Sequence, residues 1–262
     1  ADSATVTVAG DFTTSGGLIG ASCLTLNGSS EYATATTADF RTADTSGTIE
    51  AWIKTSNSGA QHILAVSDTA TANYYQTVYL NSGYLYIEHK DSSVVYGLRS
   101  TNTVHDGKWH HVAVVSSGSA ITMYIDGKEE VVVVSEGTNN GDWYGDMTDA
   151  KLDNLTIGVL TRTSNAGYFN GSIDEVRVWS TARTVTQIRT NMFTEVAADA
   201  TGLVHQWSFN EGTSTTINDT CSNVTDINLT LTPDDGGWAA GGTLTWTETD
   251  GVPSAGTLNM SG

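Results

Sequence analysis

The sequence predicts an all-β sandwich of two antiparallel sheets with one short helix. Three observations support this fold class. Short apolar runs follow one another closely, turns rich in Gly, Asn and Ser separate most of them, and a single stretch near residue 184 carries helix signals. Such close spacing favours a sandwich over a fold in which strands and helices alternate. At 262 residues the chain is also long enough to bury a sizeable core.

Each predicted strand is a hydrophobic or alternating run that ends at a turn signal. Residues 1–20 are rich in Thr, Ser and Gly, and the alternating piece 4–9 is interpreted as an edge strand or a leader. The remaining strands are predicted at 24–26, 32–36, 48–55, 62–67, 74–80, 85–89, 94–100, 109–115, 121–125, 131–134, 155–159 and 227–231. The dipeptide Asp126-Gly127 favours a type I′ hairpin turn after the strand 121–125.

The stretch from Ile173 to Trp179 alternates side chains between two faces, which predicts a strand. Its β-branched residues should pack, whereas Asp174 and Arg177 should meet water or an ion. The residues that follow predict the helix, because Thr184 and Gln187 have the spacing of a capping box and two apolar residues lie one turn apart.

Four stretches together resemble the laminin-G-like, concanavalin A-like jelly-roll domains of secreted Bacteroidetes proteins. They are LTLNGSSEY (24–32), GTIEAWIK (47–54), DGKWHHVAVV (106–115) leading to YIDGK (124–128), and FNGSIDEVRVWSTARTVTQI (169–188). Residues 202–212 resemble the family's terminal strand and turn. The resemblance implies a jelly-roll β-sandwich over residues 1–232, followed by a Gly-rich tail, 233–262, that is a linker or the start of another module. It implies little about activity, because one fold hosts many functions.

The composition narrows the classes of partner. Asp and Glu outnumber Lys and Arg by 29 to 11, so the formal net charge is −18. Nucleic acids and anionic membranes attract basic patches, so neither is an expected partner. Cations, neutral glycans and basic partners are favoured, although adaptation of the surface to salty water also explains the charge. No apolar run reaches the roughly 18 residues that a membrane-spanning helix needs.

The two cysteines, Cys23 and Cys221, lie near opposite ends of the predicted domain. The resemblance places those ends close together in space and thereby implies a disulfide bond. A bond that closes so long a loop contributes about 4 to 5 kcal/mol in the chain-entropy model, and it would indicate an oxidising compartment. The alternative is two separate buried thiols.

Catalytic patterns are weak in this chain. Glycosidases need two carboxyl groups about 5 to 10 Å apart on one face of a cleft. Asp174 and Glu175 are adjacent and so should point to opposite faces of a strand, and Glu88 and Asp91 diverge in the same way. The six histidines show no metal-ligand spacing. The sequence therefore predicts a protein that is not an enzyme.

Calcium is a better motivated cofactor, because it prefers the carboxylate and carbonyl oxygens of acidic loops. A first site follows from the resemblance to jelly-roll glucanases, in which an Asp on the equivalent strand binds a structural calcium. By that resemblance Asp174 would be a ligand, with oxygens from Asn27, Gly28 and Asp11. The alternative is that Asp174 only caps or pairs with Arg177.

A second acidic site is the loop that holds Asp142, Asp146, Asp149 and Asp153. Four carboxylates this close repel one another unless they are hydrated or bridged by a cation. A solvated loop is the alternative.

The same loop carries Trp143 and Tyr144, and large aromatic side chains exposed on loops commonly mark recognition surfaces. We expect these rings to stack on a sugar while polar neighbours bind its hydroxyls, namely Asn139, Asn140, Asp142 and Arg162. Weaker candidates are Tyr74, Tyr75 and Tyr168.

The sequence analysis therefore predicts a non-catalytic module that binds a glycan or another cell-surface ligand, with calcium as a structural or bridging ion. The module is expected to be monomeric, secreted or at the cell surface, and part of a larger bacterial protein that does not insert in membranes. The alternatives are an adhesive spacer domain of a large adhesin and a polysaccharide hydrolase or lyase.

Overall fold

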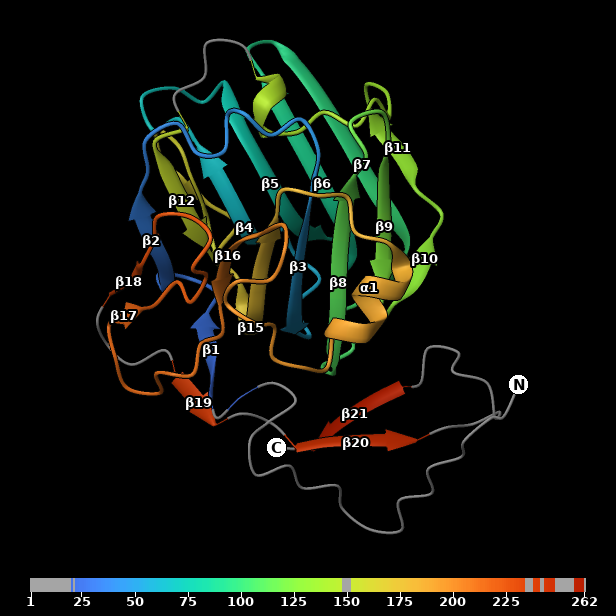
Figure 1. The fold of residues 1–262 in the computed structure, drawn as a ribbon, viewed down its shortest axis with the longest axis vertical. Helices are drawn as coiled ribbons and strands as arrows, with labels where there is room; N and C mark the ends of the chain where they lie inside the picture. Colours follow the sequence, from blue (N-terminus) through green and yellow to red (C-terminus); the bar gives the residue numbers. More distant parts are fainter. Residues whose placement is uncertain are drawn as a thin grey trace.

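The computed structural model describes residues 20, 22–147, 152–233, 238–240, 243–247 and 257–261. Asp11, Asp149 and the strand predicted at 4–9 lie outside these residues. Two antiparallel sheets form a sandwich, with sheet A in front and sheet B behind in Figure 1. This confirms the predicted fold class.

Sheet A lies under the helix. Its strand order is β10 (Lys128–Glu130), β9 (Ile121–Ile125), β8 (Trp109–Ser116), β3 (Gly47–Lys54), β15 (Asn170–Trp179), β1 (Ser22–Asn27) and β19 (Trp238–Ala240), and β16 (Leu203–Trp207) also pairs with β15. Because β19 pairs with β1, residues after 233 contribute an edge strand to this sheet.

Sheet B forms the opposite layer. Its order is β11 (Val133–Glu136), β7 (Val94–Thr103), β6 (Tyr84–Asp91), β5 (Tyr74–Asn81), β4 (Gln61–Ser67), β12 (Asn154–Ile157), β2 (Tyr32–Thr36), β18 (Leu229–Thr232) and β17 (Thr216–Ile217). Two hairpins complete the strands, β13 (Leu160–Thr161) with β14 (Asn165–Ala166) and β20 (Thr243–Thr247) with β21 (Thr257–Ser261).

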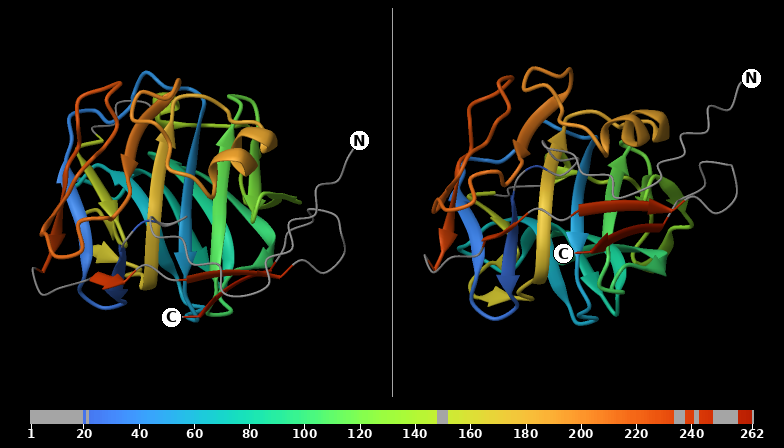
Figure 2. Two further views of the ribbon diagram at one scale, coloured as in Figure 1. Left: turned by 60° about the horizontal axis from the view of Figure 1, so that its bottom comes forward. Right: turned by 90° about the horizontal axis from the view of Figure 1, so that it is seen from below.

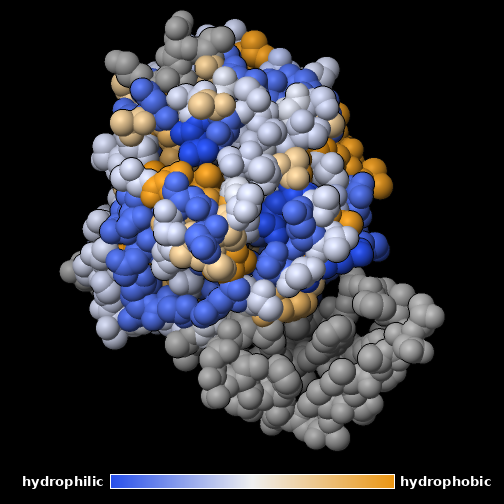
Figure 3. All heavy atoms as spheres, viewed as in Figure 1, coloured by the Kyte–Doolittle hydropathy of each residue, from blue (hydrophilic) through white to orange (hydrophobic). Residues whose placement is uncertain are grey.

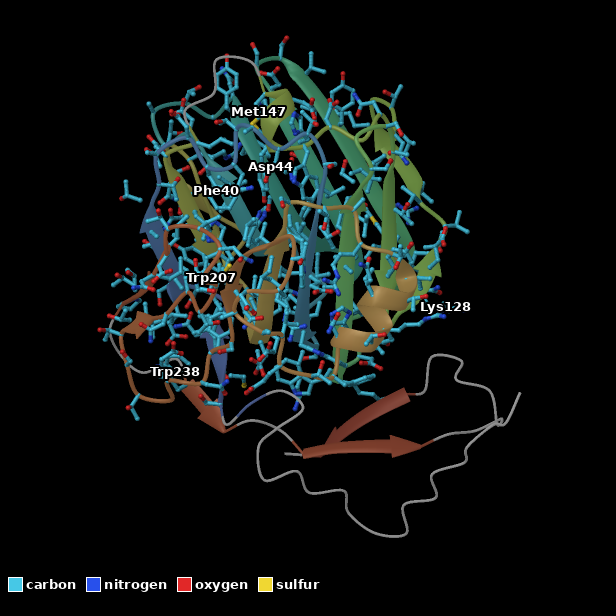
Figure 4. All side chains as sticks on the ribbon, in the orientation of Figure 1. Phe40, Asp44, Lys128, Met147, Trp207 and Trp238 are labelled. Atoms are coloured by element: carbon cyan, nitrogen blue, oxygen red, sulfur yellow. The ribbon has the colours of Figure 1, made fainter. Side chains whose placement is uncertain are left out.

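The core lies between the two sheets, because every second residue of a strand points to the same face. On β6, for example, Leu85 and Ile87 are buried while Tyr84, Tyr86 and Glu88 on the other face are partly exposed. Phe40 and Trp207, both labelled in Figure 4, belong to this core.

The predicted helix is α1 (Val185–Asn191), on the outer side of sheet A (Figure 2). The predicted capping box is confirmed: the Thr184 hydroxyl accepts a hydrogen bond from the Gln187 backbone, and the Gln187 side chain accepts one from the Thr184 backbone. Ile188 holds the helix on the sheet by packing against Ala113 and Val115.

Asp174 and Arg177 do not meet water, which was one of the two environments predicted for them. They are 0% and 1% exposed, because the chain after α1 covers them. Arg177 donates hydrogen bonds to the carbonyl oxygens of Asn191 and Thr194 in that chain, and to the Glu175 carboxylate. These polar residues of β15 thus form buried contacts between sheet A and the chain after α1.

Asp174 and Glu175 also do not point to opposite faces. The register of β15 shifts between Asp174 and Arg177, and Glu175 has a positive φ of 49°. Such a bulge breaks the two-residue alternation. Asp174 pairs with Trp52 and Arg177 with Glu50, so Asp174, Glu175 and Arg177 all lie on the covered face of sheet A.

The chain crosses from sheet A to sheet B after the hairpin of β9 and β10, and one strand predicted there differs from the structure. The Asp126-Gly127 turn is confirmed, with φ values of 51° and 70°. The strand predicted at 131–134 is correct only from Val133, where β11 begins in sheet B, because β10 ends at Glu130 in sheet A and the two residues between them cross from one sheet to the other. Val131 in the crossing is 71% exposed. The face of the molecule that carries α1 is mostly hydrophilic (Figure 3).

The predicted disulfide is not formed, and both cysteines are buried. Cys23 precedes Leu24, which pairs with Ile173, whereas the Cys221 sulfur lies 3.4 Å from the carbonyl oxygen of Leu203, which pairs with Trp179. Ile173 and Trp179 are six residues apart on β15, roughly 20 Å along a strand. A disulfide requires Cα atoms within about 7 Å.

Among the described residues, no helix is both long and apolar enough to cross a lipid bilayer.

Candidate ligand-binding face

The two loop aromatics predicted to stack on a sugar are buried in the core. Trp143 and Tyr144 are both 0% exposed, and their rings pack on each other with centroids 5.3 Å apart. A turn of 3-10 helix, η1 (Tyr144–Asp146), directs them inward, and the Asp146 carboxylate accepts a hydrogen bond from the Trp143 backbone at 2.8 Å. The expectation that these rings are exposed is therefore wrong.

The polar neighbours of these rings serve the fold. The Asn139 side chain bonds both the backbone N–H and the carbonyl of Ile121 on β9. Asn140 accepts a hydrogen bond from the Asp142 backbone, and Asp142 lines a small cavity with His89. Of the predicted binding set, only Arg162 lies elsewhere.

The residues predicted for the first calcium site do not converge. Asn27 pairs with Asn170, which is four residues from Asp174 on β15, or roughly 13 Å along the strand. The side-chain oxygen of Asn27 accepts hydrogen bonds from its own turn, and Gly28 packs against Asn170 rather than Asp174. One ion cannot contact all of these groups.

The second acidic set is described only in part, because Asp149 lies outside the described residues. Asp153 accepts hydrogen bonds from Thr69, and Asp146 caps η1. Across the described part of the chain, no three His, Cys, Asp or Glu side chains form a group that could hold a metal. Calcium therefore stays a prediction.

The outer face of sheet B carries a different cluster, which we name the tyrosine face: Tyr75, Tyr79, Tyr84, Tyr86 and Glu88. Strands β5 and β6 supply all five side chains, and Tyr79 pairs directly with Tyr86. The rings of Tyr79 and Tyr86 stack with centroids 5.0 Å apart and an interplanar angle of 30°. His62 on β4 extends the stack, 5.1 Å from Tyr79.

Glu88 lies at the centre of this face. Its carboxylate accepts hydrogen bonds from the hydroxyl of Tyr75 and, at 3.2 Å, from that of Tyr79. Burial, followed by the contact with Glu88, raises the pKa of both phenols. The two tyrosines therefore stay protonated and hold the carboxylate in place as donors.

Two arginines lie flat on the tyrosines. The Arg162 guanidinium is 5.0 Å from the centroid of the Tyr75 ring, and that of Arg99 is 4.6 Å from the Tyr84 ring. Arg162 comes from the β13–β14 hairpin and Arg99 from β7. Burial and the charge of Arg162 lower the pKa of His62 to about 3, so the histidine is neutral near pH 7.

The sequence analysis identified only part of this face. Tyr75 and Arg162 were candidates, whereas Tyr79, Tyr84, Tyr86 and Glu88 were missed. The signal was present in β6, where Tyr, Tyr and Glu alternate with buried residues. Tyr74 lies at the start of β5, outside the cluster. Tyr168 lies away from it, packed against Tyr32 with ring centroids 6.1 Å apart.

This arrangement suits a polyhydroxylated ligand. Flat aromatic rings on a sheet offer apolar area for a sugar ring at little entropic cost. A carboxylate has about four acceptor sites, and the two tyrosines use two of them. Glu88 can therefore accept further hydrogen bonds from the hydroxyl groups of a sugar. Arg99 and Arg162 add donors at the margins.

Comparison with known proteins agrees with the fold. The family model described as the concanavalin A-like lectin/glucanases superfamily, Laminin_G_3, matches residues 27–189. No curated protein matches significantly.

Three solved structures illustrate the similarity. A proposed carbohydrate-binding protein from Bacteroides ovatus is 20% identical, with a TM-score of 0.57. The match covers 84% of this chain and 61% of the other, so this chain spans about three fifths of that protein. The CBM40 of a Ruminococcus gnavus sialidase, bound to α2,3-sialyllactose, is 18% identical with a TM-score of 0.51, covering 67% of this chain and 98% of the other. A pentraxin from Limulus polyphemus is 17% identical with a TM-score of 0.51 and coverages of 85% and 95%. At these identities the likeness shows the fold alone.

Proposed function

Because the chain belongs to the concanavalin A-like lectin/glucanase superfamily, with the family model matching residues 27–189, we propose that it is a carbohydrate-binding module whose ligand lies on the tyrosine face. The observation that carries this proposal is the partly exposed pair Tyr79 and Tyr86 beside Glu88 on the outer face of sheet B. Accessible aromatic area and a fixed acceptor are what a sugar ring requires.

Two of the similar structures support the same class of function, since one is described as a carbohydrate-binding protein and another holds sialyllactose. We propose further that the module is non-catalytic, monomeric and one part of a larger bacterial protein that is secreted or displayed on the cell surface. The acidic residues of β15 do not argue for catalysis, because Asp174 and Glu175 are 0% and 3% exposed beneath the cover of sheet A.

The test is a glycan array followed by calorimetric titration of the best ligand. Tyr79→Ala and Tyr86→Ala should each lower the affinity about tenfold or more, since losing one stacking ring removes of the order of 1.4 kcal/mol. Tyr86→Ala should change the unfolding midpoint little, because its ring is partly exposed, whereas Tyr79→Ala should lower it, because that ring also stacks on His62 and its hydroxyl bonds Glu88. Tyr32→Ala is the matched control, because that partly exposed tyrosine lies on β2, which β12 and β4 separate from β5.

Two outcomes would overturn the proposal. A chain that shows no saturable binding on a broad array would be a spacer domain. Release of reducing ends or unsaturated products from a polysaccharide would make it an enzyme.

A further inference from the structure

Cations are few in this acidic chain. The sequence has 11 Lys and Arg against 29 Asp and Glu. Among the described cations, Arg41 pairs with Asp44, Lys108 with Asp106 and Arg177 with Glu175. Several others form no ion pair among the described residues, and three of those gather at the tyrosine face.

Three cations border the tyrosine face, and none of them is within ion-pair distance of a carboxylate among the described residues. Arg162 lies on Tyr75, Arg99 lies on Tyr84, and Lys90 alternates with Glu88 on β6 and pairs with Tyr75. The Nε atom of Arg162 is buried and has no hydrogen-bond partner. A guanidinium without a carboxylate partner has donors that an external anion can use.

The carboxylates on this side do not neutralise these cations. Glu88 is held by the hydroxyls of Tyr75 and Tyr79 rather than by an arginine. Glu136 on the edge strand β11 lies opposite Gly97 of β7, and Glu130 accepts hydrogen bonds from Thr101 and Asn102, beyond Arg99 on β7. Among the described residues, none of these three carboxylates forms an ion pair with the cations of the tyrosine face.

The spacing of the cations indicates the length of the ligand. Arg162 lies at Tyr75, which is opposite Lys90, whereas Arg99 lies at Tyr84, six residues from Lys90 on the same strand. Six residues of strand span roughly 20 Å. Charges so far apart would contact several units of an extended chain, not one terminal sugar.

From these contacts we propose that the ligand of the tyrosine face is an extended acidic polysaccharide, whose carboxylate or sulfate groups bind Lys90, Arg99 and Arg162 while its sugar rings pack on the exposed parts of Tyr79 and Tyr86. The proposal rests on the proposed function and specifies the substrate class of the same face.

The experiment titrates the full chain with three probes: polygalacturonate, which carries carboxylates, carrageenan, which carries sulfates, and laminarin, which is neutral. We expect saturable binding of one acidic probe and at least tenfold weaker binding of laminarin. Arg99→Gln and Arg162→Gln should each weaken the acidic ligand about tenfold, and added salt should weaken it further, because charge contacts at an exposed face are screened.

Two variants serve as controls. Arg189→Gln removes the same charge from α1, on the other side of the sandwich, and should leave the affinity unchanged. Arg162→Lys keeps the charge and should recover part of the binding lost in Arg162→Gln. The acidic probe that binds decides between carboxylate and sulfate.

Failure of this inference is distinguishable from failure of the proposed function. If laminarin binds as tightly as the acidic probes, with loss in Tyr86→Ala but none in the arginine variants, the face binds neutral glycans and only this inference falls. If no probe binds and the glycan array is empty, both fall.

Discussion

Trp143 is a core residue, so its substitution should affect stability rather than binding. Its ring is 0% exposed and packs on Tyr144. Trp143→Ala should lower the free energy of unfolding by about 3 to 5 kcal/mol, since a large buried side chain leaves a cavity. Denaturant unfolding measures this loss, and the glycan affinity of the folded protein should stay constant. If the variant instead lost affinity while its stability stayed unchanged, Trp143 would be a ligand-binding residue.

Asp174 should destabilise the fold at neutral pH. Burial, followed by the charge of Glu175, raises the pKa of its carboxyl group well above the usual range, and its Oδ2 atom has no partner. The folded state therefore holds a proton that the unfolded state has released, so the contribution of this group to stability falls as pH rises above about 3.9, the unfolded value.

The isosteric change Asp174→Asn tests this directly. At pH 7 the variant should be more stable by of the order of 1 to 3 kcal/mol, because Asn is neutral without the proton that Asp174 must take up on folding. The difference should vanish in acid, where both states of the parent are protonated. Thermal unfolding at a series of pH values measures it, and a variant that is less stable at every pH would contradict the assignment.

At the scale of elements, α1 depends on its cap and on one buried side chain. A helix of seven residues is not stable alone. Thr184→Ala removes the hydroxyl that accepts from the Gln187 backbone, so we expect a loss of about 1 kcal/mol. Thr186→Ala, at an exposed position inside the same helix, should cost nothing. Equal losses in the two variants would mean that the cap contributes nothing specific.

The elements that could be predicted are those whose sequence pattern involves only neighbouring residues. The capping box and the Asp126-Gly127 turn are set by neighbouring residues, and both were predicted correctly. The bulge at Glu175 and the crossing at Val131 depend on partners distant in sequence, so alternation alone failed there. The candidate site combines both cases. The Tyr and Glu of β6 alternate visibly, but only the pairing of β5 with β6 brings Tyr79 onto Tyr86.

At the scale of the whole molecule, the net charge of −18 should make stability depend on salt. Like charges repel in the compact state, and salt screens this repulsion. The described surface ion pairs, Arg41 with Asp44 and Lys108 with Asp106, offset little of it. Sodium chloride should therefore raise the unfolding midpoint by several degrees before levelling off. A midpoint that falls with salt would show that attraction, not repulsion, dominates the charge distribution.

Calcium would also screen the repulsion between these negative charges. It would stabilise the fold more than sodium chloride of the same ionic strength only if it binds at a specific site. Since Asp174 and Asn27 do not converge, the calcium prediction depends on the loop of Asp142 and Asp146. At matched ionic strength, calcium in excess of a chelator should raise the midpoint by mass action, because it adds about 2.7 kcal/mol to the free energy of unfolding at a hundredfold excess over the dissociation constant. Asp142→Asn should abolish the rise, while Asp174→Asn should keep it. An equal midpoint with calcium and with chelator would leave the acidic loop as a solvated surface and would exclude calcium as a stabilising ion.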